Sequence, residues 1–465
     1  MKKVLYQPEG IWFGDCMPYY HNGRFYLFHQ RDTRNPGPLV ESEPFGWALA
    51  VTEDFVTYVD HGEALARGDN DAQDQFIYAG SIFGEEGRFT AMYTGFNRDY
   101  VGTGKAAQVL MRAESDDLLH WRKTGRRLVE PQPGYDPDEW RDPWVIRDEE
   151  NHRYVMLIGT RKLEGGKIAT GCIVWFTSTD MEHWTFEGDF WAPGLFYVQE
   201  MPEIFFWNGW WYLVYTEYSD ASKTRYRMSR SLNGTWLLPP GGDDAFDGRA
   251  YYAARSCCDG NRRFLFGWVP TRRDECDDRS DWVWGGTLLV HEVLQAADGH
   301  LEVIPVESIV GAFGAQKDLP CPPAAGRVDG DFGIPLTPGT TDHFCLKMRI
   351  KLEKVSGSLS LRLFEDSTTG DAYEFRLDAP AGQISFDKVP AFPWYRYDNR
   401  GISRPFRLSE GMNLDMTLLV DDTIATLYVN GTALSTRMYD KRGRAASLHC
   451  ADCAVTVESV SISEL

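Results

Sequence analysis

The chain has 465 residues, enough for two domains or for one large β domain with a smaller partner. Aromatic residues make up 14% of it, a share that favours a β-rich protein with aromatic-lined clefts over a doubly wound α/β enzyme. The formal net charge of −20 is spread along the chain, which argues against a nucleic-acid partner and indicates a well-solvated surface.

Nine cysteines are scattered along the sequence, and only Cys450 and Cys453 form a CxxC pair. Reduced thiols explain that pair better than half of a zinc site, and reduced thiols favour a cytoplasmic protein. The first residues carry lysines but no apolar signal-peptide core, and no apolar run is long enough to span a bilayer. We therefore expect no leader, no membrane partner, no metal and no cofactor; the pattern does not define an oligomeric state.

Five segments in the first 270 residues repeat one pattern, in which a turn signal and a basic or aromatic residue precede an apolar strand. They are residues 22–28, 86–92, 151–157, 208–214 and 261–267. Their aromatic anchors are 64, 65, 57 and 53 residues apart, which leaves room for about four short strands per unit. The spacing predicts an all-β fold with a five-bladed β-propeller over residues 1–305; the alternative is a series of β-sandwiches with chance similarity.

The remaining chain has a different pattern. Residues 306–330 are rich in glycine and proline and predict a linker. Residues 331–465 carry closely spaced period-2 strands, such as 344–350, 359–363 and 424–431, which are typical of an antiparallel β-sandwich. We find no chemistry-bearing pattern in this domain, and its charged residues are expected on solvated strand faces.

Acidic residues precede three of the five repeats at nearly equal offsets. Asp15 lies 10 residues before Phe25, Asp142 lies 12 before Tyr154, and Glu200 lies 11 before Trp211. The first strand of each propeller blade lines the central channel, so equal offsets place these carboxyl groups at one depth around one mouth.

Three carboxylates converging in an aromatic-rich pocket are a plausible glycosidase arrangement. Structural roles compete with this interpretation. Asp15 could cap a turn, Asp142 could form an ion pair with Arg141, and Glu203 competes with Glu200 for the same role. We favour Asp15, Asp142 and Glu200 as the catalytic set.

Several motifs resemble glycoside hydrolase family 32, the β-fructofuranosidase family of invertases, inulinases and levanases. Residues 140–143 (Trp-Arg-Asp-Pro) look like its Arg-Asp-Pro motif, and residues 200–203 (Glu-Met-Pro-Glu) resemble its Glu-Cys-Pro-Asp motif. Residues 12–18 occupy the place of its Trp-Met-Asn-Asp-Pro-Asn-Gly motif. Residues 78–81 and 93–95 resemble its Phe-Ser-Gly-Ser and Tyr-Thr-Gly pair, and residues 266–269 and 284–288 resemble the end of its fifth blade.

This resemblance implies a retaining hydrolase of terminal fructofuranosyl linkages in a small carbohydrate. Asp15 would be the nucleophile, Glu200 the acid/base, and Asp142 with Arg141 would hydrogen-bond the sugar hydroxyls. The same resemblance implies these substrate-binding residues: Trp12, Gln30, Tyr78, Ser81, Arg141, Trp268 and Trp284.

The chain also departs from the family pattern. Gly14 replaces an asparagine, Ala79 replaces a serine, and residues 290–292 (Val-His-Glu) replace Pro-Arg-Glu. Two polar donors are thus missing at the sugar site, so the expected substrates are sucrose, a fructo-oligosaccharide or a related fructoside, and not plain sucrose alone. Two alternatives stay open: an inverting family 43-like arabinofuranosidase or xylosidase, and a non-catalytic sugar-binding propeller. Transfer of the fructosyl group to another sugar is also compatible with the sequence.

Overall fold

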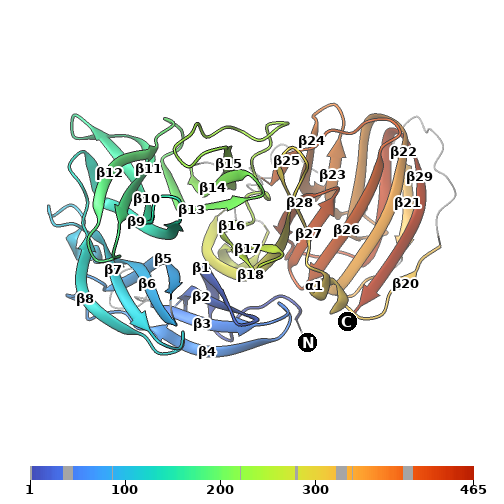
Figure 1. Cartoon of the computed structure of the whole chain (residues 1–465). Coiled ribbons are helices and arrows are strands. Elements are labelled where there is room, and N and C mark those ends of the chain that lie inside the picture. The colour runs from blue at the N-terminus through green and yellow to red at the C-terminus, as the bar shows by residue number, and fades with distance from the viewer. Residues whose placement is uncertain are drawn as a thin grey trace.

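In the computed structural model, five antiparallel blades surround a central channel, and a β-sandwich packs beside them (Figure 1). The structure describes residues 3–34, 46–85, 87–219, 221–277, 281–320, 332–337, 339–390 and 402–465. The expected five-bladed propeller followed by an antiparallel sandwich is confirmed. Residues 321–330 of the predicted linker lie outside the described residues.

Blades 1 to 3 each contain four strands in chain order. Blade 1 contains β1 (Trp12–His21), β2 (Arg24–Asp32), β3 (Trp47–Thr52) and β4 (Tyr58–Leu65). Blade 2 contains β5 (Phe76–Glu85), β6 (Arg88–Phe96), β7 (Gln108–Ser115) and β8 (Arg122–Val129), with a 3-10 turn at Arg98–Tyr100. Blade 3 contains β9 (Tyr135–Asp148), β10 (Arg153–Glu164), β11 (Lys167–Ser178) and β12 (Thr185–Trp191).

Blades 4 and 5 complete the ring. Blade 4 contains β13 (Val198–Trp207), β14 (Trp210–Tyr218) and β15 (Thr224–Ser229). Two isolated bridges, from Met228 to Leu237 and from Arg225 to Ala245, stand where a fourth strand is expected. Pro239 and Pro240 lie between the two bridges, and because proline has no N–H to donate, they interrupt the ladder. Blade 5 contains β16 (Tyr252–Cys258), β17 (Arg263–Arg272), β18 (Trp282–Gln295) and β19 (Leu301–Pro305), with a 3-10 turn at Arg273–Glu275.

The innermost strands β1, β5, β9, β13 and β16 contact one another in a closed circle, which is the channel wall that the equal offsets predicted. Blades 5 and 1 are also joined into one eight-stranded sheet, because Phe13 of β1 pairs with Gly286 of β18. The ring is thus closed by backbone hydrogen bonding between its first and last blades.

The sandwich is built around two long bent strands, β22 (His343–Glu365) and β29 (Ala445–Glu464), which pair along their whole length. The first half of β22 pairs with β26 (Asn413–Asp421), which continues into β27 (Ile424–Val429) and β28 (Thr432–Arg437). Its second half pairs with β23 (Ala372–Asp378), which continues into β24 (Gln383–Val389) and β25 (Ser403–Pro405). The short strands β20 (Lys317–Asp318) and β21 (Phe332–Thr337) pair with β29.

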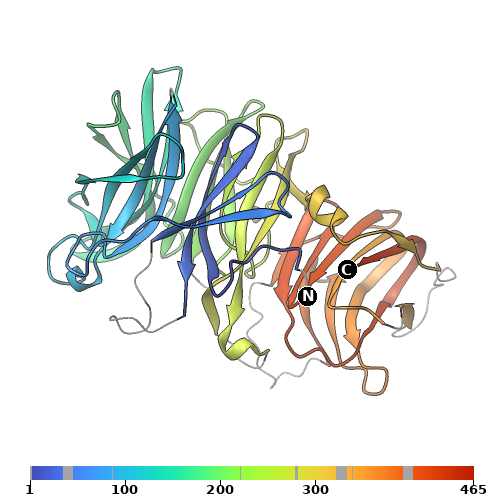
Figure 2. The ribbon, with the colours of Figure 1, turned by 90° about the horizontal axis from the view of Figure 1, so that it is seen from below.

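Buried polar side chains join the sandwich to the propeller. Arg437 of β28 donates to the carbonyl oxygens of Val269 and Pro270, at 2.8 Å each. Asp247, in the loop before blade 5, accepts from the backbone N–H and the hydroxyl of Ser435, at 2.7 and 2.6 Å. Figure 2 shows the two parts in contact along one side of the propeller. These bonds fix the sandwich against blade 5.

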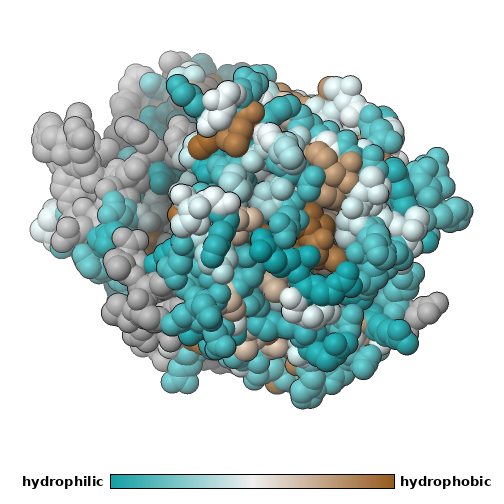
Figure 3. Space-filling model, turned by 90° about the vertical axis from the view of Figure 1, so that its left-hand side faces the viewer, coloured by the Kyte–Doolittle hydropathy of each residue, from teal (hydrophilic) through white to brown (hydrophobic). Residues whose placement is uncertain are grey.

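Helix contributes little to the described part of the chain, where the single α-helix is the five-residue α1 (Glu307–Gly311). Among the described residues, no helix has both the length and the apolar character that crossing a membrane would require. The face of the propeller farthest from the sandwich is mainly hydrophilic with small, separate hydrophobic patches (Figure 3). This face agrees with the expectation of a well-solvated surface.

Candidate active site

A cavity of about 780 Å³ opens at one mouth of the propeller channel. Its walls include Asp15 from β1, Asp142 from β9 and Glu200 from β13, so the three acidic residues meet although they come from three blades. Glu203, the competing acid, lies elsewhere: it is fully buried and accepts hydrogen bonds from the backbone N–H and the hydroxyl of Ser256. The geometry therefore favours Glu200 over Glu203 as the acid that faces the cavity.

All five inner strands are irregular at the level of the cavity. The pairing register shifts between Phe13 and Cys16, Tyr78 and Gly80, Arg141 and Trp144, Glu200 and Glu203, and Tyr252 and Arg255. Asp142 and Met201 lie in these bulges with φ of 62° and 52°, and each is followed by a proline. A bulge turns the local backbone out of the ladder, so side chains that would alternate between faces are aimed into the channel.

Backbone N–H groups that leave the strand pairing at these bulges form hydrogen bonds to neighbouring blades. The N–H of Asp142 donates to the Thr94 hydroxyl at 3.0 Å, and that hydroxyl donates to the carbonyl of Ala79. The N–H of Met201 donates to the Asp142 carboxylate at 3.0 Å. Blades 2, 3 and 4 are thus linked through groups next to the candidate catalytic residues.

Arg141 connects two of the three acids. Its guanidinium lies 2.6 Å from a Glu200 oxygen and 3.6 Å from an Asp142 oxygen. The Tyr252 hydroxyl donates a short hydrogen bond to the other Glu200 oxygen. Burial raises the pKa of that tyrosine well above its usual range, and the Glu200 carboxylate adds to the shift, so Tyr252 stays a donor. Glu200 is therefore held in one orientation by two partners.

Asp15 has a different environment. Trp268 Nε1 donates to its carboxylate at 3.1 Å. Burial is the main reason why the pKa of Asp15 lies well above its usual range, and the charges of Asp142 and Glu200 raise it further. The Trp268 hydrogen bond and the Arg255 guanidinium oppose the shift by favouring the carboxylate.

Asp142 is only 3% exposed. Burial raises its pKa, the Arg141 charge opposes that shift, and Glu200 adds to it. Two of the three carboxyl groups therefore bind a proton more readily than an ordinary aspartate, as expected for like charges gathered in a place with little solvent.

The expected substrate-binding residues fall into two groups. Gln30, Tyr78, Arg141 and Trp284 line the cavity, and Trp268 reaches it through its bond to Asp15. Burial raises the pKa of Tyr78 to about 12, so its phenol stays protonated. Neither Trp12 nor Ser81 is part of the cavity wall that the described residues form.

Trp12 and Ser81 have structural contacts instead. The Arg34 guanidinium lies 4.2 Å above the Trp12 ring, and Arg34 itself faces the cavity. The Ser81 hydroxyl is buried and accepts from the Val145 N–H at 3.3 Å. Trp12 thus packs against Arg34, which lines the cavity, and Ser81 connects β5 to β9 by a hydrogen bond.

Some residues of the site carried no distinctive pattern in the sequence. Arg255 is fully buried below the cavity and donates to the carbonyls of Gly80, Asp142 and Pro202, one from each of three neighbouring inner strands. Glu139 forms ion pairs with Arg141 and, at 3.4 Å, with Arg161. A period-2 analysis of β9 would have found Glu139, because residues 139 and 141 share one face of a strand.

The replacement of asparagine by Gly14 has a steric explanation. A Cβ atom at position 14 would lie 2.2 Å from Cη2 of Trp284, so the indole ring occupies the space of a side chain. Trp284 also packs edge-on against Trp268, with ring centroids 5.5 Å apart. An aromatic wall thus stands where the family pattern places an amide.

A five-bladed propeller with an appended sandwich and a carboxyl-lined cavity defines the class as glycoside hydrolase. A family model described as the glycosyl hydrolases family 32 N-terminal domain matches residues 6–305. The chain belongs to glycosyl hydrolase family 32, which sets aside the family 43 alternative.

Relatives and solved structures agree with this assignment. The chain is 23% identical to sucrose-6-phosphate hydrolase from Escherichia coli over 459 residues, which cover 93% of this chain and 86% of the relative. The structure is similar to that of sucrose-6-phosphate hydrolase from Lactobacillus gasseri, with a TM-score of 0.79, 18% identity and coverage of 100% of this chain and 93% of the other. It is also similar to fructan 1-exohydrolase IIa from Cichorium intybus, with a TM-score of 0.77, 17% identity and coverage of 100% and 97%. These likenesses establish the fold of both parts.

Proposed function

We propose that this protein is a retaining glycoside hydrolase that cleaves terminal β-D-fructofuranosyl linkages through a covalent fructosyl-enzyme intermediate. The observation that carries the proposal is the meeting of Asp15, Asp142 and Glu200 in one cavity. Membership of family 32 supports the reaction type, and the names of the relatives, which include sucrose-6-phosphate hydrolase and levanase, support a fructoside substrate.

In this mechanism the Asp15 carboxylate attacks the anomeric carbon while Glu200 protonates the departing oxygen. The glycosidic bond breaks, an ester to Asp15 forms, and a water molecule deprotonated by Glu200 then cleaves that ester. Asp142 and Arg141 hydrogen-bond the sugar hydroxyls and balance the charge that develops on the ring. The contacts of Glu200 with Arg141 and Tyr252 support its role, since a proton donor must be held at a fixed position.

The charge of the cavity favours a neutral sugar over a phosphorylated one. Its wall holds six carboxyl groups and four guanidinium groups: Asp15, Asp32, Asp138, Glu139, Asp142 and Glu200, and Arg34, Arg98, Arg141 and Arg161. Arg34 and Arg161 are already paired with Asp32 and Asp136, at 3.4 and 2.8 Å. A phosphate would add negative charge to an acidic site, so we expect kcat/KM for sucrose to exceed that for sucrose 6-phosphate by roughly tenfold or more.

Two variants test the assignment of roles. Asp15→Asn is expected to abolish turnover of sucrose and of an aryl fructofuranoside alike. Glu200→Gln is expected to lower kcat on sucrose by about 10²- to 10⁴-fold. With the aryl fructofuranoside, whose leaving group needs no proton, it should spare the initial burst of aryl alcohol and slow the steady-state turnover, because Glu200 also deprotonates the water of the second step. Glu203→Gln is the matched control and keeps kcat on both substrates. Wild-type rates in Asp15→Asn, or release of the α-anomer seen by NMR, would refute the mechanism.

We also propose that the enzyme acts in the cytoplasm on a small carbohydrate. The eight cysteines within the described residues are all free thiols, which supports a reducing compartment. Fractionation of the native host followed by immunodetection tests this; recovery of the protein outside the cell would reject it.

A further inference from the structure

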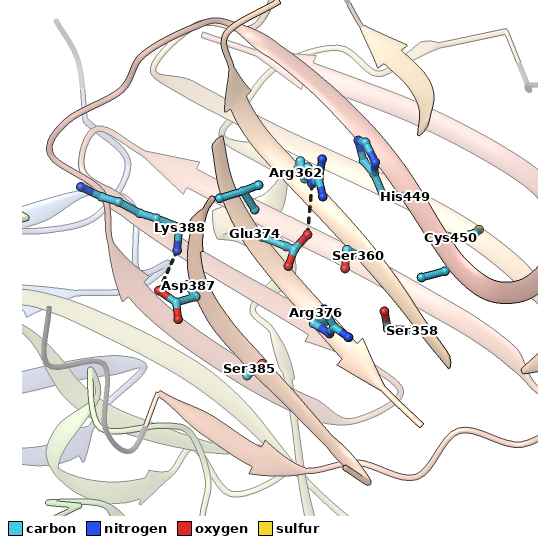
Figure 4. Close-up of a pocket in the computed structure, with 12 residues that line it drawn as sticks. Ser358, Ser360, Arg362, Glu374, Arg376, Ser385, Asp387, Lys388, His449 and Cys450 are labelled. Carbon is cyan, nitrogen blue, oxygen red and sulfur yellow. Dashed lines mark hydrogen bonds and ion pairs between the residues drawn. The ribbon is translucent and has the colours of Figure 1, made fainter. Parts of the chain in front are cut away.

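A second polar cavity lies in the sandwich, far along the chain from the carboxyl cluster. Its volume is about 320 Å³, at the lower end of the range of roughly 300–1,000 Å³ for ligand pockets. It is formed by four adjacent strands, β22, β23, β24 and β29 (Figure 4). Its lining residues are Ser358, Ser360, Arg362, Glu374, Arg376, Ser385, Asp387, Lys388, Val389, His449, Cys450 and Ala451.

Strand alternation explains why this face is polar. Leu359, Leu361 and Leu363 of β22 point into the core of the sandwich. Ser358, Ser360 and Arg362 alternate with them and so point to the opposite face, where Figure 4 shows Ser360 and Arg362 near Glu374. A sheet face exposed to solvent alone commonly carries long charged side chains; this one has small hydroxyl residues at its centre with charged residues around them.

The serine hydroxyls at the floor lack protein partners. Ser358 and Ser360 are 3% and 4% exposed. Neither hydroxyl makes a hydrogen bond to any residue that the structure describes, although both face the cavity. Neither hydroxyl is among the fully enclosed polar atoms without a partner, so both open into the cavity. Two hydroxyls that face one hollow and are not used by the protein are available to hydrogen-bond a polar ligand.

The charged wall is already neutralised by protein groups. Arg362 pairs with Glu374 at 3.1 Å, Arg376 pairs with Asp378 at 3.0 Å, and Lys388 lies 3.0 Å from Asp277 of the propeller. Arg362 and Arg376 keep N–H groups that these carboxylates do not use, and Glu374 keeps lone pairs that Arg362 does not use. The wall therefore offers both donors and acceptors without excess charge, which suits vicinal hydroxyl groups better than an anion.

We propose that this cavity is a second carbohydrate-binding site, which holds one or two rings of a neutral sugar chain through Ser358, Ser360 and the Arg362–Glu374 pair. The site catalyses nothing. It tethers a long substrate to the sandwich and thereby raises the concentration of chain ends at the propeller cavity. Only the choice of a fructan as probe rests on the proposed function of the propeller.

The test uses full-length protein and a pair of matched variants on one strand. Ser360→Gln fills the cavity with a longer side chain. Ser356→Gln is the control, since Ser356 is exposed on the same strand outside the cavity. Glu374→Gln removes an acceptor with little change of shape and serves as the second variant if Ser360→Gln folds poorly. The measurements are kcat and KM for inulin and for sucrose, and retardation of the Asp15→Asn protein in native gels that contain inulin.

We expect Ser360→Gln and Glu374→Gln to raise KM for inulin about five- to tenfold and to reduce the gel retardation, with sucrose kinetics within about twofold of wild type. Ser356→Gln should match wild type throughout. Unchanged inulin KM and retardation in both cavity variants would overturn the proposal.

Failure of the proposed function is distinguishable from failure of the second site. If wild type cleaves no fructoside, the site is tested by saturation-transfer NMR with neutral oligosaccharides. A signal lost in Ser360→Gln and kept in Ser356→Gln supports it, and equal signals reject it. Binding of inorganic phosphate in place of sugars, lost in Ser360→Gln, would also reject it in favour of an anion site.

Discussion

Trp268 Nε1 donates a hydrogen bond of 3.1 Å to the carboxylate of Asp15, which joins the end of the propeller sequence to its beginning. Burial and the acidic neighbours raise the pKa of Asp15 and so favour its neutral form. The hydrogen bond from Trp268 is one of two influences that oppose this shift and favour the carboxylate. Nucleophilic attack requires the carboxylate, so the strength of this bond bears directly on the acid limit of activity.

Replacement of Trp268 by phenylalanine should move that limit. The change keeps an aromatic ring and removes the N–H donor, so the pKa of Asp15 rises further. Activity is lost as pH falls through this pKa, and the acid limb of the kcat/KM profile should therefore shift to higher pH. A limb that stays in place, measured on sucrose from pH 3 to 8, would show that Asp15 does not control it.

Asp15→Asn should make the protein more stable while it inactivates it. The folded-state pKa of Asp15 is raised, so the wild type loses stability as pH rises from the unfolded value of about 3.9 through the folded value. Asparagine carries no charge and still accepts from Trp268. The melting temperature of Asp15→Asn should exceed that of wild type by a few degrees at pH 7, and the gain should vanish near pH 3. A constant gain at both pH values contradicts this account.

Gly14 and Trp284 should be energetically coupled. Gly14→Ala places a methyl group against the indole, and overpacking of this kind costs about 1 to 3 kcal/mol of unfolding free energy. In a Trp284→Leu background the same substitution should cost close to nothing, because the space is then empty. Urea denaturation of the four proteins of this cycle measures the coupling; additive effects would mean that the indole moves aside freely.

Asp247 should be important for docking the sandwich. Burial raises its pKa, but hydrogen bonds from His291 and Ser435 outweigh this and hold the pKa below the usual range. Asp247→Ala removes one partner of a buried polar cluster and should lower the free energy of unfolding by about 3 to 5 kcal/mol at pH 7.

The pH dependence of this loss has a defined sign. A depressed folded-state pKa contributes stability that is present above the unfolded pKa and is lost as pH falls through the folded one. The cost of Asp247→Ala should thus shrink on acidification. A cost that grows at low pH would show that the charge of Asp247 opposes docking.

The repeats allowed the propeller and its channel to be predicted. Each blade has the same strand order, so equal offsets of Asp15, Asp142 and Glu200 from their repeats place them at the same depth on the inner strands. The alternation of polar and apolar residues after Phe344 predicted the sandwich for the same reason: period 2 is a backbone property. The roles of the individual acids were inferred from the resemblance to the family.

Other features depend on contacts between distant residues and left no local pattern. Arg255 bridges three inner strands through carbonyl groups that the bulges expose, and those carbonyl groups lie far from it in the sequence. The small hydroxyl residues of β22 looked like an ordinary solvated face, since a strand pattern cannot show whether its outer surface is flat or hollow.

The pairing of Phe13 with Gly286 has a further consequence for biosynthesis. All three acids lie in the first 200 residues, yet β1 acquires its neighbour β18 and Asp15 its partner Trp268 only after the ribosome has made the fifth blade. The nascent chain should therefore be inactive until the fifth blade pairs with the first and closes the ring. Stalled translation products that end before residue 252 should be inert towards any fructoside, whereas release of the complete ring should restore turnover.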